Sequence, residues 1–188
     1  MIYLSKKLSE MPLEELWQLF PIILTAPDPR WNDWYAQEEA FLRSVLPEEF
    51  AAGIHHLGST SIRGIWAKPI VDILVEAAPG ADLSCADEAL VRAGYRCMSR
   101  SDSRRSYNKG YTEEGFAEKV FHLHLVHVEE QTEILFRDYL RTHPDDAKAY
   151  EALKLSLWKP YEHDRDGYTN AKTDFVQAIL DKARENHK

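Results

Sequence analysis

The chain has 188 residues and a formal net charge of −8, and it is 44% apolar and 29% charged. This length suits one globular domain and is short for two, and the negative charge argues against a general nucleic-acid binder, which needs many Lys and Arg contacts to phosphates. No apolar run approaches the ~20 residues of a membrane span and the N-terminus lacks a signal-peptide pattern, so we expect no membrane partner and a cytoplasmic location. Cys85 and Cys97 are too few and too irregularly spaced for a metal knuckle or a disulfide framework, so we expect reduced packing residues.

The N-terminal part of the chain predicts two helices and a strand. A short helix begins near Pro12 and ends near Phe20, and its apolar residues recur with a 3.6-residue period, so we expect it to pack on the main body. Asp28-Pro29 is typical of an N-cap and first turn, and it opens a helix that ends near Leu46. A strand is expected near residues 53–57.

The middle of the chain predicts a helix near residues 83–93 between further strands. These strands are expected near residues 70–77, 94–98, 104–109 and 119–128. The alternation from Val120 to Val128 sends His122 and His124 to one face, and the opposite face carries the core residues Phe121, Leu123 and Leu125.

The C-terminal third predicts helices only. Two helices, near residues 132–142 and 144–157, are separated at His143-Pro144, and a last helix is expected from about Tyr168 to Arg184. Strands in the first two-thirds and helices in the last third favour an α+β fold. We therefore expect one domain, 1–188, with an N-terminal helical extension (1–26), a sheet-containing core (27–130) and a helical lobe (131–188).

The segment from Ile54 to Glu76 carries the most specific chemical pattern. Gly58 lets the backbone approach a ligand closely because it has no Cβ. Ser59 and Thr60 can open a helical turn whose free N–H groups favour anions. Asp72, on the next strand, offers the hard oxygen ligand that Mg²⁺ prefers. This order of parts indicates a site that holds a phosphate chain beside a metal ion.

The same segment and several later motifs resemble the GrpB family. The similar residues run in the family's order over about Trp31–Leu180: His56, Gly58-Ser59-Thr60, Gly64, Ala67-Lys68-Pro69, Asp72-Ile73, His122-Leu123-His124, Phe136 to Arg141, His143-Pro144, Tyr150, Leu153-Lys154, and Tyr168-Thr169 with Lys172. The resemblance implies the nucleotidyltransferase superfamily and its DNA-polymerase-β-like fold, a mixed β-sheet flanked by helices with a C-terminal helical lobe.

The resemblance also implies a metal site, from which this sequence departs. Enzymes of that superfamily place two acids at i and i+2 on one strand and a third on a neighbouring strand, and these hold two metal ions. Here the first acid is Asp72, but Leu74 stands at i+2. We expect His122 or His124 to supply the third position, so the catalytic and metal-binding set is Asp72, His122 and His124, with Mg²⁺ or Mn²⁺ as the divalent cofactor. Imidazoles suit Mn²⁺ better than Mg²⁺.

The first hypothesis for function is a metal-dependent nucleotidyltransferase that moves a nucleoside monophosphate from an NTP to a small-molecule acceptor. The residues expected to bind the nucleotide and its phosphates are Gly58, Ser59, Thr60, Lys68, Arg137, Arg141 and Lys172. The alternative is a non-catalytic domain that binds a nucleotide or another phosphometabolite and has a degenerate metal site, which Leu74 favours. A third hypothesis is a metal-dependent enzyme of another class built on Asp72, His122 and His124.

Several of these residues also allow a structural interpretation. Asp72 can accept hydrogen bonds from the backbone or from Lys68 instead of binding a metal, and Lys68 can neutralise Asp72 instead of contacting a phosphate. Arg137 and Arg141 are like charges at i and i+4, which disfavours an isolated helix. Either Asp138 or a bound phosphate compensates for them.

Three other features leave the same choice open. Tyr168 and Lys172 can stack on a base or ribose, or can pack in a helical core. The basic cluster from Arg96 to Lys109 is either a solvated rim or an entry funnel for an anion. His55 and His56 lie on opposite faces of their strand, so one of them shares the layer of the site.

Overall fold

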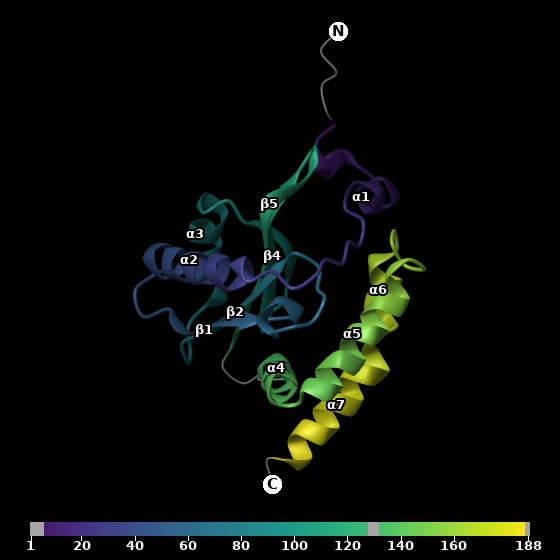
Figure 1. Cartoon of the computed structure of the whole chain (residues 1–188). Coiled ribbons are helices and arrows are strands. Elements are labelled where there is room, and N and C mark those ends of the chain that lie inside the picture. Colours follow the sequence, from purple (N-terminus) through teal and green to yellow (C-terminus); the bar gives the residue numbers. More distant parts are fainter. Residues whose placement is uncertain (1–5, 128–131, 187–188) are drawn as a thin grey trace.

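The computed structural model describes residues 6–127 and 132–186 (Figure 1). The helices in this part are α1 (Leu13–Leu19), α2 (Arg30–Val45), α3 (Asp87–Arg92), α4 (Thr132–Thr142), α5 (Pro144–Trp158), α6 (Arg165–Asn170) and α7 (Thr173–Glu185). The strands are β1 (Ala51–Leu57), β2 (Val71–Ala77), β3 (Arg96–Arg100), β4 (Arg104–Thr112) and β5 (Gly115–His127). Short 3₁₀ turns lie at Leu8–Glu10 (η1), Ser59–Ser61 (η2) and Leu83–Ala86 (η3).

The described strands form one mixed five-stranded sheet in the order β1-β2-β5-β4-β3. Strands β2 and β5 pair in parallel, and the other neighbouring strands pair antiparallel. The β2–β5 register places Asp72 beside His122 and Leu74 beside His124. The sheet therefore brings together residues that lie 50 positions apart in the sequence.

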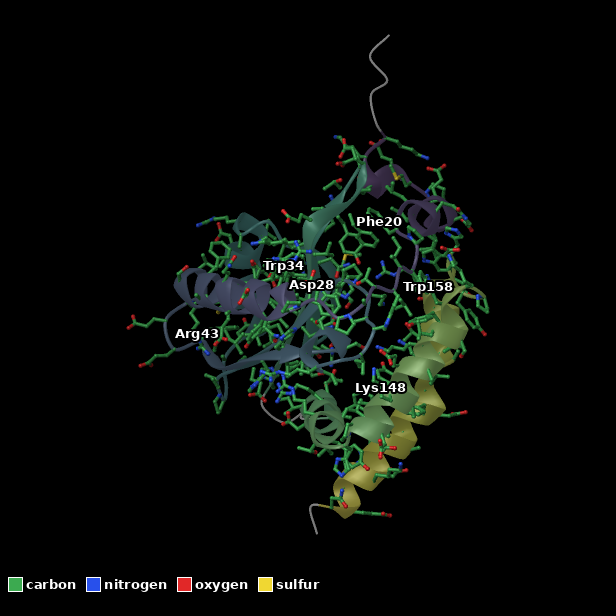
Figure 2. All side chains as sticks on the ribbon, in the orientation of Figure 1. Phe20, Asp28, Trp34, Arg43, Lys148 and Trp158 are labelled. Atoms are coloured by element: carbon green, nitrogen blue, oxygen red, sulfur yellow. The ribbon has the colours of Figure 1, made fainter. Side chains whose placement is uncertain are left out.

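One face of the sheet is covered by α2 and α3, as Figure 1 shows. The alternate residues Ile73 and Val75 of β2 and Leu123 and Leu125 of β5 are at most 1% exposed, and they pack in one apolar core with the tryptophans of α2. In Figure 2, Trp34 lies between α2 and the sheet, whereas the exposed Arg43 points outward. This face provides most of the apolar burial that stabilises the sheet.

The opposite side of the sheet is directed toward the C-terminal helices. Near its β1 end, Leu57, Leu74 and Val126 pack in a smaller apolar cluster with Ile134 of α4. A separate core joins α4, α5 and α7 and includes Ile62 and Ile65 of the β1–β2 connection. The helical lobe is thus attached to the sheet through the same connection that carries Gly58 and η2.

The N-terminal segment lies between the sheet and the lobe. Ile22 donates its N–H to the Glu162 carbonyl oxygen over 2.7 Å, and its own carbonyl accepts from Trp158 Nε1 over 2.6 Å. The Phe20 ring lies 4.7 Å from the Tyr111 ring. Phe20 and Ile22 therefore pack on the main body. Helix α1 itself has no buried residue and Leu13 is 51% exposed, so the predicted packing of its apolar face is only partly borne out.

The α+β fold with a mixed sheet, flanking helices and a C-terminal helical lobe is confirmed, with three corrections of detail. The predicted last helix is two helices, because the amide of Lys172 bonds back to Thr169 and a new helix, α7, begins at Thr173 and packs in the core of the lobe. The helix expected at 83–93 begins as the 3₁₀ turn η3. That turn directs Leu83 and Ala86 inward and leaves Cys85 exposed, so Cys85 is not a packing residue.

Val128 and the expected boundary at residues 130–131 lie outside the described residues. None of the described helices is both long and apolar enough to span a membrane.

Candidate functional site

Asp72, His122 and His124 lie on the face of the sheet opposite α2 and α3. Alternation sends their sequence neighbours into the large core, so these three side chains project to the other side. Nδ1 of His122 lies 3.2 Å from Oδ1 of Asp72, and the Asp72 side chain is 30% exposed. The predicted placement of the two histidines and Asp72 on one face of neighbouring strands is confirmed.

A chain of polar contacts runs from Asp72 to Arg165. The Tyr111 hydroxyl accepts a hydrogen bond from Arg165 Nη2 over 3.1 Å and lies 2.7 Å from His122 Nε2. Because Arg165 can only donate, the Tyr111 proton is free to be donated to Nε2. In this arrangement Nδ1 of His122 carries a proton that faces Asp72.

The surroundings of Asp72 favour its ionised form. Burial raises the pKa of this carboxyl, but the contact with His122 and the positive charges of His122, His124 and Lys68 outweigh it and lower the pKa below its usual value. Asp72 is therefore a carboxylate at neutral pH. The close partner of the Asp72 carboxylate is His122. The structural interpretation from the sequence expected backbone donors or Lys68 instead.

Gly58 is packed directly against Asp72. Its φ is +66°, and a Cβ at this position would lie 2.1 Å from Oδ2 of Asp72, so only glycine fits both the backbone and the space. The 3₁₀ turn η2 follows at once and confirms the helical turn predicted at Ser59 and Thr60. The Thr60 hydroxyl donates to the Ile70 carbonyl oxygen over 3.2 Å and lies 3.0 Å from His56 Nε2, so this hydroxyl holds the turn to the strands.

The histidines of β1 divide between the two faces. His55 Nε2 lies 2.8 Å from Glu76 Oε2 on the side of Asp72. His56 lies on the side of α2, where its ring stacks 4.7 Å from that of Tyr35. Burial lowers the pKa of His56 to about 4, so His56 is a neutral packing residue at physiological pH.

His124 is held by β4. Its Nδ1 lies 3.2 Å from the Ser106 hydroxyl oxygen, and burial lowers the pKa of this imidazole. In the part of the chain that the structure describes, no three His, Cys, Asp or Glu side chains are grouped so that they could hold one metal ion. The metal role of Asp72, His122 and His124 as a set therefore stays a prediction.

A cluster of lysines from the connection and the lobe lies near Asp72. The ammonium groups of Lys68 and Lys172 lie 5.6 Å and 4.3 Å from the centre of the Tyr168 ring. Neither has a hydrogen bond or an ion pair with any residue in the described ranges. Tyr168 itself is 1% exposed and its hydroxyl is buried without a hydrogen-bond partner among the described residues.

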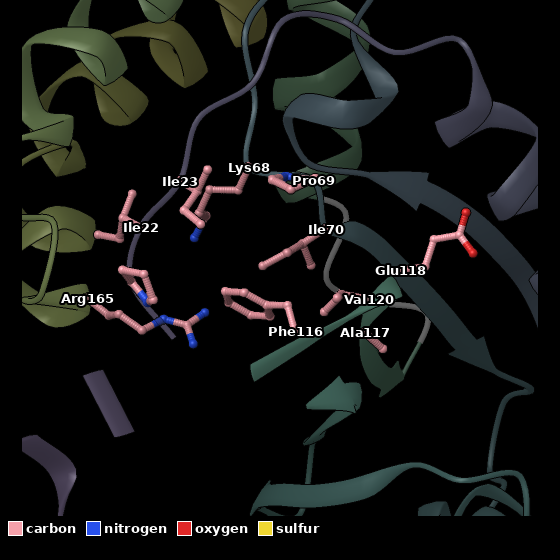
Figure 3. Close-up of a pocket in the computed structure, with 11 residues that line it drawn as sticks. Ile22, Ile23, Lys68, Pro69, Ile70, Phe116, Ala117, Glu118, Val120 and Arg165 are labelled. Carbon is pink, nitrogen blue, oxygen red and sulfur yellow. The ribbon is translucent and has the colours of Figure 1, made fainter. Parts of the chain in front are cut away.

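Burial weakens the charge of these lysines. It lowers the pKa of Lys68 to about 7, helped by the charges of Arg165 and Lys172, and it lowers the pKa of Lys172 to about 8. Lys68 makes no close ion pair with Asp72 in the described structure, but its charge helps to lower the pKa of that carboxyl. Figure 3 shows Lys68 and Arg165 directed into one cavity of about 60 Å³, beside Phe116 and Ile70.

Sequence reasoning missed three members of this site, which are Tyr111, Lys154 and Arg165. Lys154 is 2% exposed, donates to the Trp66 carbonyl oxygen, and has a pKa that burial lowers to about 7. The available signal was a lysine inside the apolar face of a helix, next to Leu153 in the motif that resembles GrpB. Tyr111 and Arg165 carried no signal, because the fold alone brings them to His122.

Arg137 and Arg141 join α4 to the connection. Arg137 Nη1 donates to the His56 carbonyl oxygen over 3.1 Å, and Arg141 Nε donates to the Ser61 carbonyl oxygen over 3.0 Å. Asp138 Oδ1 lies 2.7 Å from Arg137 Nε and 3.7 Å from Arg141 Nη1. The compensating acid is thus present, and phosphate binding by the two arginines stays a prediction.

The basic cluster of β3 and β4 is largely paired. Arg105 contacts Asp87, Lys109 Nζ lies 2.7 Å from Glu38 Oε1, and Arg104 Nη1 lies 2.7 Å from Glu133 Oε1. Most of this cluster therefore serves to join the strands to α2, α3 and α4.

The fold and site define an α+β protein in which a helical lobe brings lysines to the polar face of a mixed sheet. The family model described as "GrpB protein" matches residues 21–182, and the chain belongs to the GrpB family. It is 36% identical over 159 residues to a UPF0157 protein of Pseudomonas aeruginosa, covering 83% of this chain but only 65% of that protein. It is 35% identical over 170 residues to the glutamate-rich protein GrpB of Alkalihalophilus pseudofirmus, covering 86% and 95% of the two chains.

A solved structure shows the same fold. The crystal structure of the conserved protein GrpB from Enterococcus faecalis matches with a TM-score of 0.75 and 29% identity, over 88% of this chain and 99% of that one. A Cid1 poly(U) polymerase structure is a more distant likeness, with a TM-score of 0.49 and 12% identity over 77% and 44% of the two chains.

Proposed function

We propose that the chain binds a nucleoside triphosphate on the polar face of the sheet and transfers its nucleoside monophosphate to a small-molecule acceptor. The observation that carries this proposal is the pair of ammonium groups of Lys68 and Lys172. They are partly buried on the ring of Tyr168 and have no hydrogen bond or close ion pair in the described structure, although the charge of Asp72 acts on both. Buried cations are normally paired. In a chain of net charge −8, such a cluster is best explained by an anionic ligand.

The resemblance to GrpB, with the nucleotidyltransferase superfamily that it implies, supports a triphosphate as the anion. Lys68, Lys172 and the neighbouring Arg165 would contact the phosphates, with Gly58 and the turn at Ser59 and Thr60 beneath them. Charge-assisted contacts of this kind orient a phosphate chain and stabilise the charge on a leaving group. Arg137 and Arg141 could each use their remaining N–H groups at the rim.

The proposed transfer is a displacement at the α-phosphorus of the nucleotide. The acceptor oxygen forms a bond to the α-phosphorus, the bridging bond between the α- and β-phosphates breaks, and pyrophosphate leaves with its electron pair. The acceptor proton would pass to Nε2 of His122, which lies against the Tyr111 hydroxyl in the free chain, and the resulting imidazolium would face the Asp72 carboxylate. Asp72 is accessible and ionised, so it fits as the single protein ligand of a Mg²⁺ ion that arrives with the phosphates, which is how proteins commonly bind this ion.

A test of phosphate binding compares two lysine variants of the whole chain. Lys172→Met keeps most of the apolar stem and removes the ammonium group. Lys159→Met is the matched control, since Lys159 also lies over an aromatic ring, that of Trp158, but is 68% exposed and paired with Glu162. Calorimetry with each of the four common NTPs and Mg²⁺ should show affinity at least about tenfold weaker for Lys172→Met. Equal affinities for the two variants would contradict the proposal.

The alternative, a nucleotide-binding domain without catalysis, is favoured by one observation. Leu74 stands where a second acid is expected, and it is fully buried in an apolar cluster. Asp72→Asn should preserve the fold and abolish metal-dependent nucleotide binding. If the unmodified chain binds an NTP equally well without Mg²⁺ or Mn²⁺ and Asp72→Asn changes nothing, the non-catalytic alternative replaces the transferase.

A further inference from the structure

A second pocket, which we call the N-terminal pocket, lies between the N-terminal segment and the strands β3 and β4. Its volume is about 530 Å³, within the range of small-molecule sites. One wall is apolar and comes from the segment before the sheet, with Leu13, Trp17 and Phe20 among its residues. Leu13 is 51% exposed and Met98 on the opposite wall is 57% exposed, so large apolar side chains line a space that no described residue fills.

The charged residues that line the pocket are all basic. Arg96, Lys109 and Arg165 line it, and none of the described lining residues is acidic. Lys109 is already paired with Glu38. Arg96 has no hydrogen bond or ion pair in the described ranges, and Arg165 donates only to the Tyr111 hydroxyl. The pocket therefore complements a molecule that has an apolar body and a negative charge.

The sheet connects this pocket to the candidate site. Asp72 pairs with His122, His122 pairs with Asn108, and Asn108 pairs with Arg96, so these four residues form one row across β2, β5, β4 and β3. At the usual strand spacing, Arg96 lies about 14 Å from Asp72. Tyr111 and Arg165 belong to the pocket wall and to the polar chain that ends at Asp72.

We propose that the N-terminal pocket binds the acceptor of the transfer reaction, and that this acceptor is a small organic anion with an apolar body. Its carboxylate or phosphate group would contact Arg96, its apolar body would lie against Leu13 and Trp17, and its hydroxyl group would point along the row toward His122 and Asp72. This assignment rests on the proposed function. The apolar wall formed by residues 8–20 lies outside the family match, which begins at residue 21, whereas Arg96 and Arg165 lie within it.

The test uses the full chain and a fluorescent probe of the same chemistry, 8-anilinonaphthalene-1-sulfonate, which has an aromatic body and one negative charge. Leu13→Glu introduces a repelling carboxylate, and Arg96→Met removes the cation. Val91→Glu and Arg100→Met are the controls, since Val91 is 54% exposed on α3 and Arg100 lies on β3 outside the pocket. We expect probe affinity to fall about tenfold for Leu13→Glu and about fivefold for Arg96→Met, and less than twofold for the controls.

Competition then defines the chemistry. Hexanoate and hexyl phosphate carry the same apolar body with the two candidate anionic groups, and whichever displaces the probe more strongly identifies the group. Hexanol should be at least about tenfold weaker than the stronger anion. Equal displacement by hexanol would overturn the anionic acceptor, and equal effects of pocket and control variants would overturn the pocket.

The proposed nucleotide site is tested separately in the same samples. ATP with Mg²⁺ should bind to Leu13→Glu as it binds to the unmodified chain and should not displace the probe. Displacement of the probe by ATP would mean that the pocket holds the nucleotide itself, and the acceptor assignment would be wrong. If ATP fails to bind the unmodified chain while the anionic probe binds in the pocket, the proposed function fails and the acceptor role fails with it, although the pocket remains an anion site.

Discussion

The two faces of the sheet differ in how their side chains are packed and paired. On the face covered by α2 and α3, residues such as Ile73 and Leu123 are completely buried in apolar contacts. On the other face, Asp72, His122 and His124 form a polar layer. Lys68 of the β1–β2 connection and Lys172 of the lobe lie near it, and neither ammonium group has a close ion pair in the described ranges. The first face is stabilised mainly by apolar burial, whereas the polar side chains of the second face are the ones that we propose to bind a ligand.

The largest expected loss of stability comes from a substitution on the face covered by α2 and α3. Leu123→Ala removes a fully buried side chain from the main core and should lower the free energy of unfolding by about 2–4 kcal/mol. His124→Ala, one residue away on the polar face, should lower it by less than about 1.5 kcal/mol, the size of its hydrogen bond with Ser106. Urea denaturation of both variants measures the difference. Equal losses would mean that the two faces contribute alike to stability.

A smaller loss of stability is expected for two glycine substitutions, which distinguish backbone strain from contact with Asp72. Gly58→Ala and Gly80→Ala both place alanine at positive φ, +66° and +78°, which should lower the free energy of unfolding by roughly 1–3 kcal/mol in each. Only at Gly58 does the added methyl group meet Asp72, because nothing lies within 4 Å of the Cβ position at Gly80. Gly58→Ala should therefore also lose nucleotide binding. Retained ATP affinity in Gly58→Ala, measured by calorimetry, would remove the Gly58–Asp72 contact from the site.

The smallest effect concerns the charge buried beneath the polar face. The pKa of Lys154 is lowered to about 7, so between pH 7 and about 10 the unfolded state binds more protons than the folded state, and the free energy of unfolding rises with pH. Lys154→Met removes this dependence. Between pH 6 and pH 8 the unmodified chain should gain on the order of 1 kcal/mol relative to the variant. Thermal and urea denaturation at the two pH values measure this dependence, with Lys159→Met as the control. The same change in the free energy of unfolding with pH for Lys154→Met and Lys159→Met would contradict the prediction.

The sequence predicted the elements of both faces better than their connections. Alternation in β5 was enough to divide Leu123 and Leu125 from His122 and His124, since a strand has only two faces. The register that pairs Asp72 with His122 was not predictable, because it depends on a parallel crossover whose length the sequence leaves free. The break at Lys172 was missed for a similar reason: helix propensity continues through it, and only packing of α7 in the lobe requires a new direction.

The candidate site was predictable where its residues are close in sequence. Gly58, Ser59, Thr60 and Asp72 form one local pattern, and the turn at Ser59 is where the pattern indicated. Tyr111 and Arg165 join the site from distant segments through contacts that no local pattern encodes. The roles of all these residues in nucleotide binding stay predictions that experiment must decide.

The most direct test of the central claim counts the protons that accompany nucleotide binding. In the free chain the pKa values of Lys68 and Lys172 are lowered to about 7 and about 8, so at pH 8 both lysines are largely or partly neutral. A triphosphate favours their charged forms, so binding should take up about one proton, and affinity should fall about tenfold or more from pH 7 to pH 9. Calorimetry of ATP with Mg²⁺ at pH 8, in two non-phosphate buffers of different ionisation enthalpy, measures this uptake. Uptake of about one proton, lost in Lys172→Met and Lys68→Met, is the predicted result; tight binding without proton uptake and with constant affinity across this pH range would contradict it.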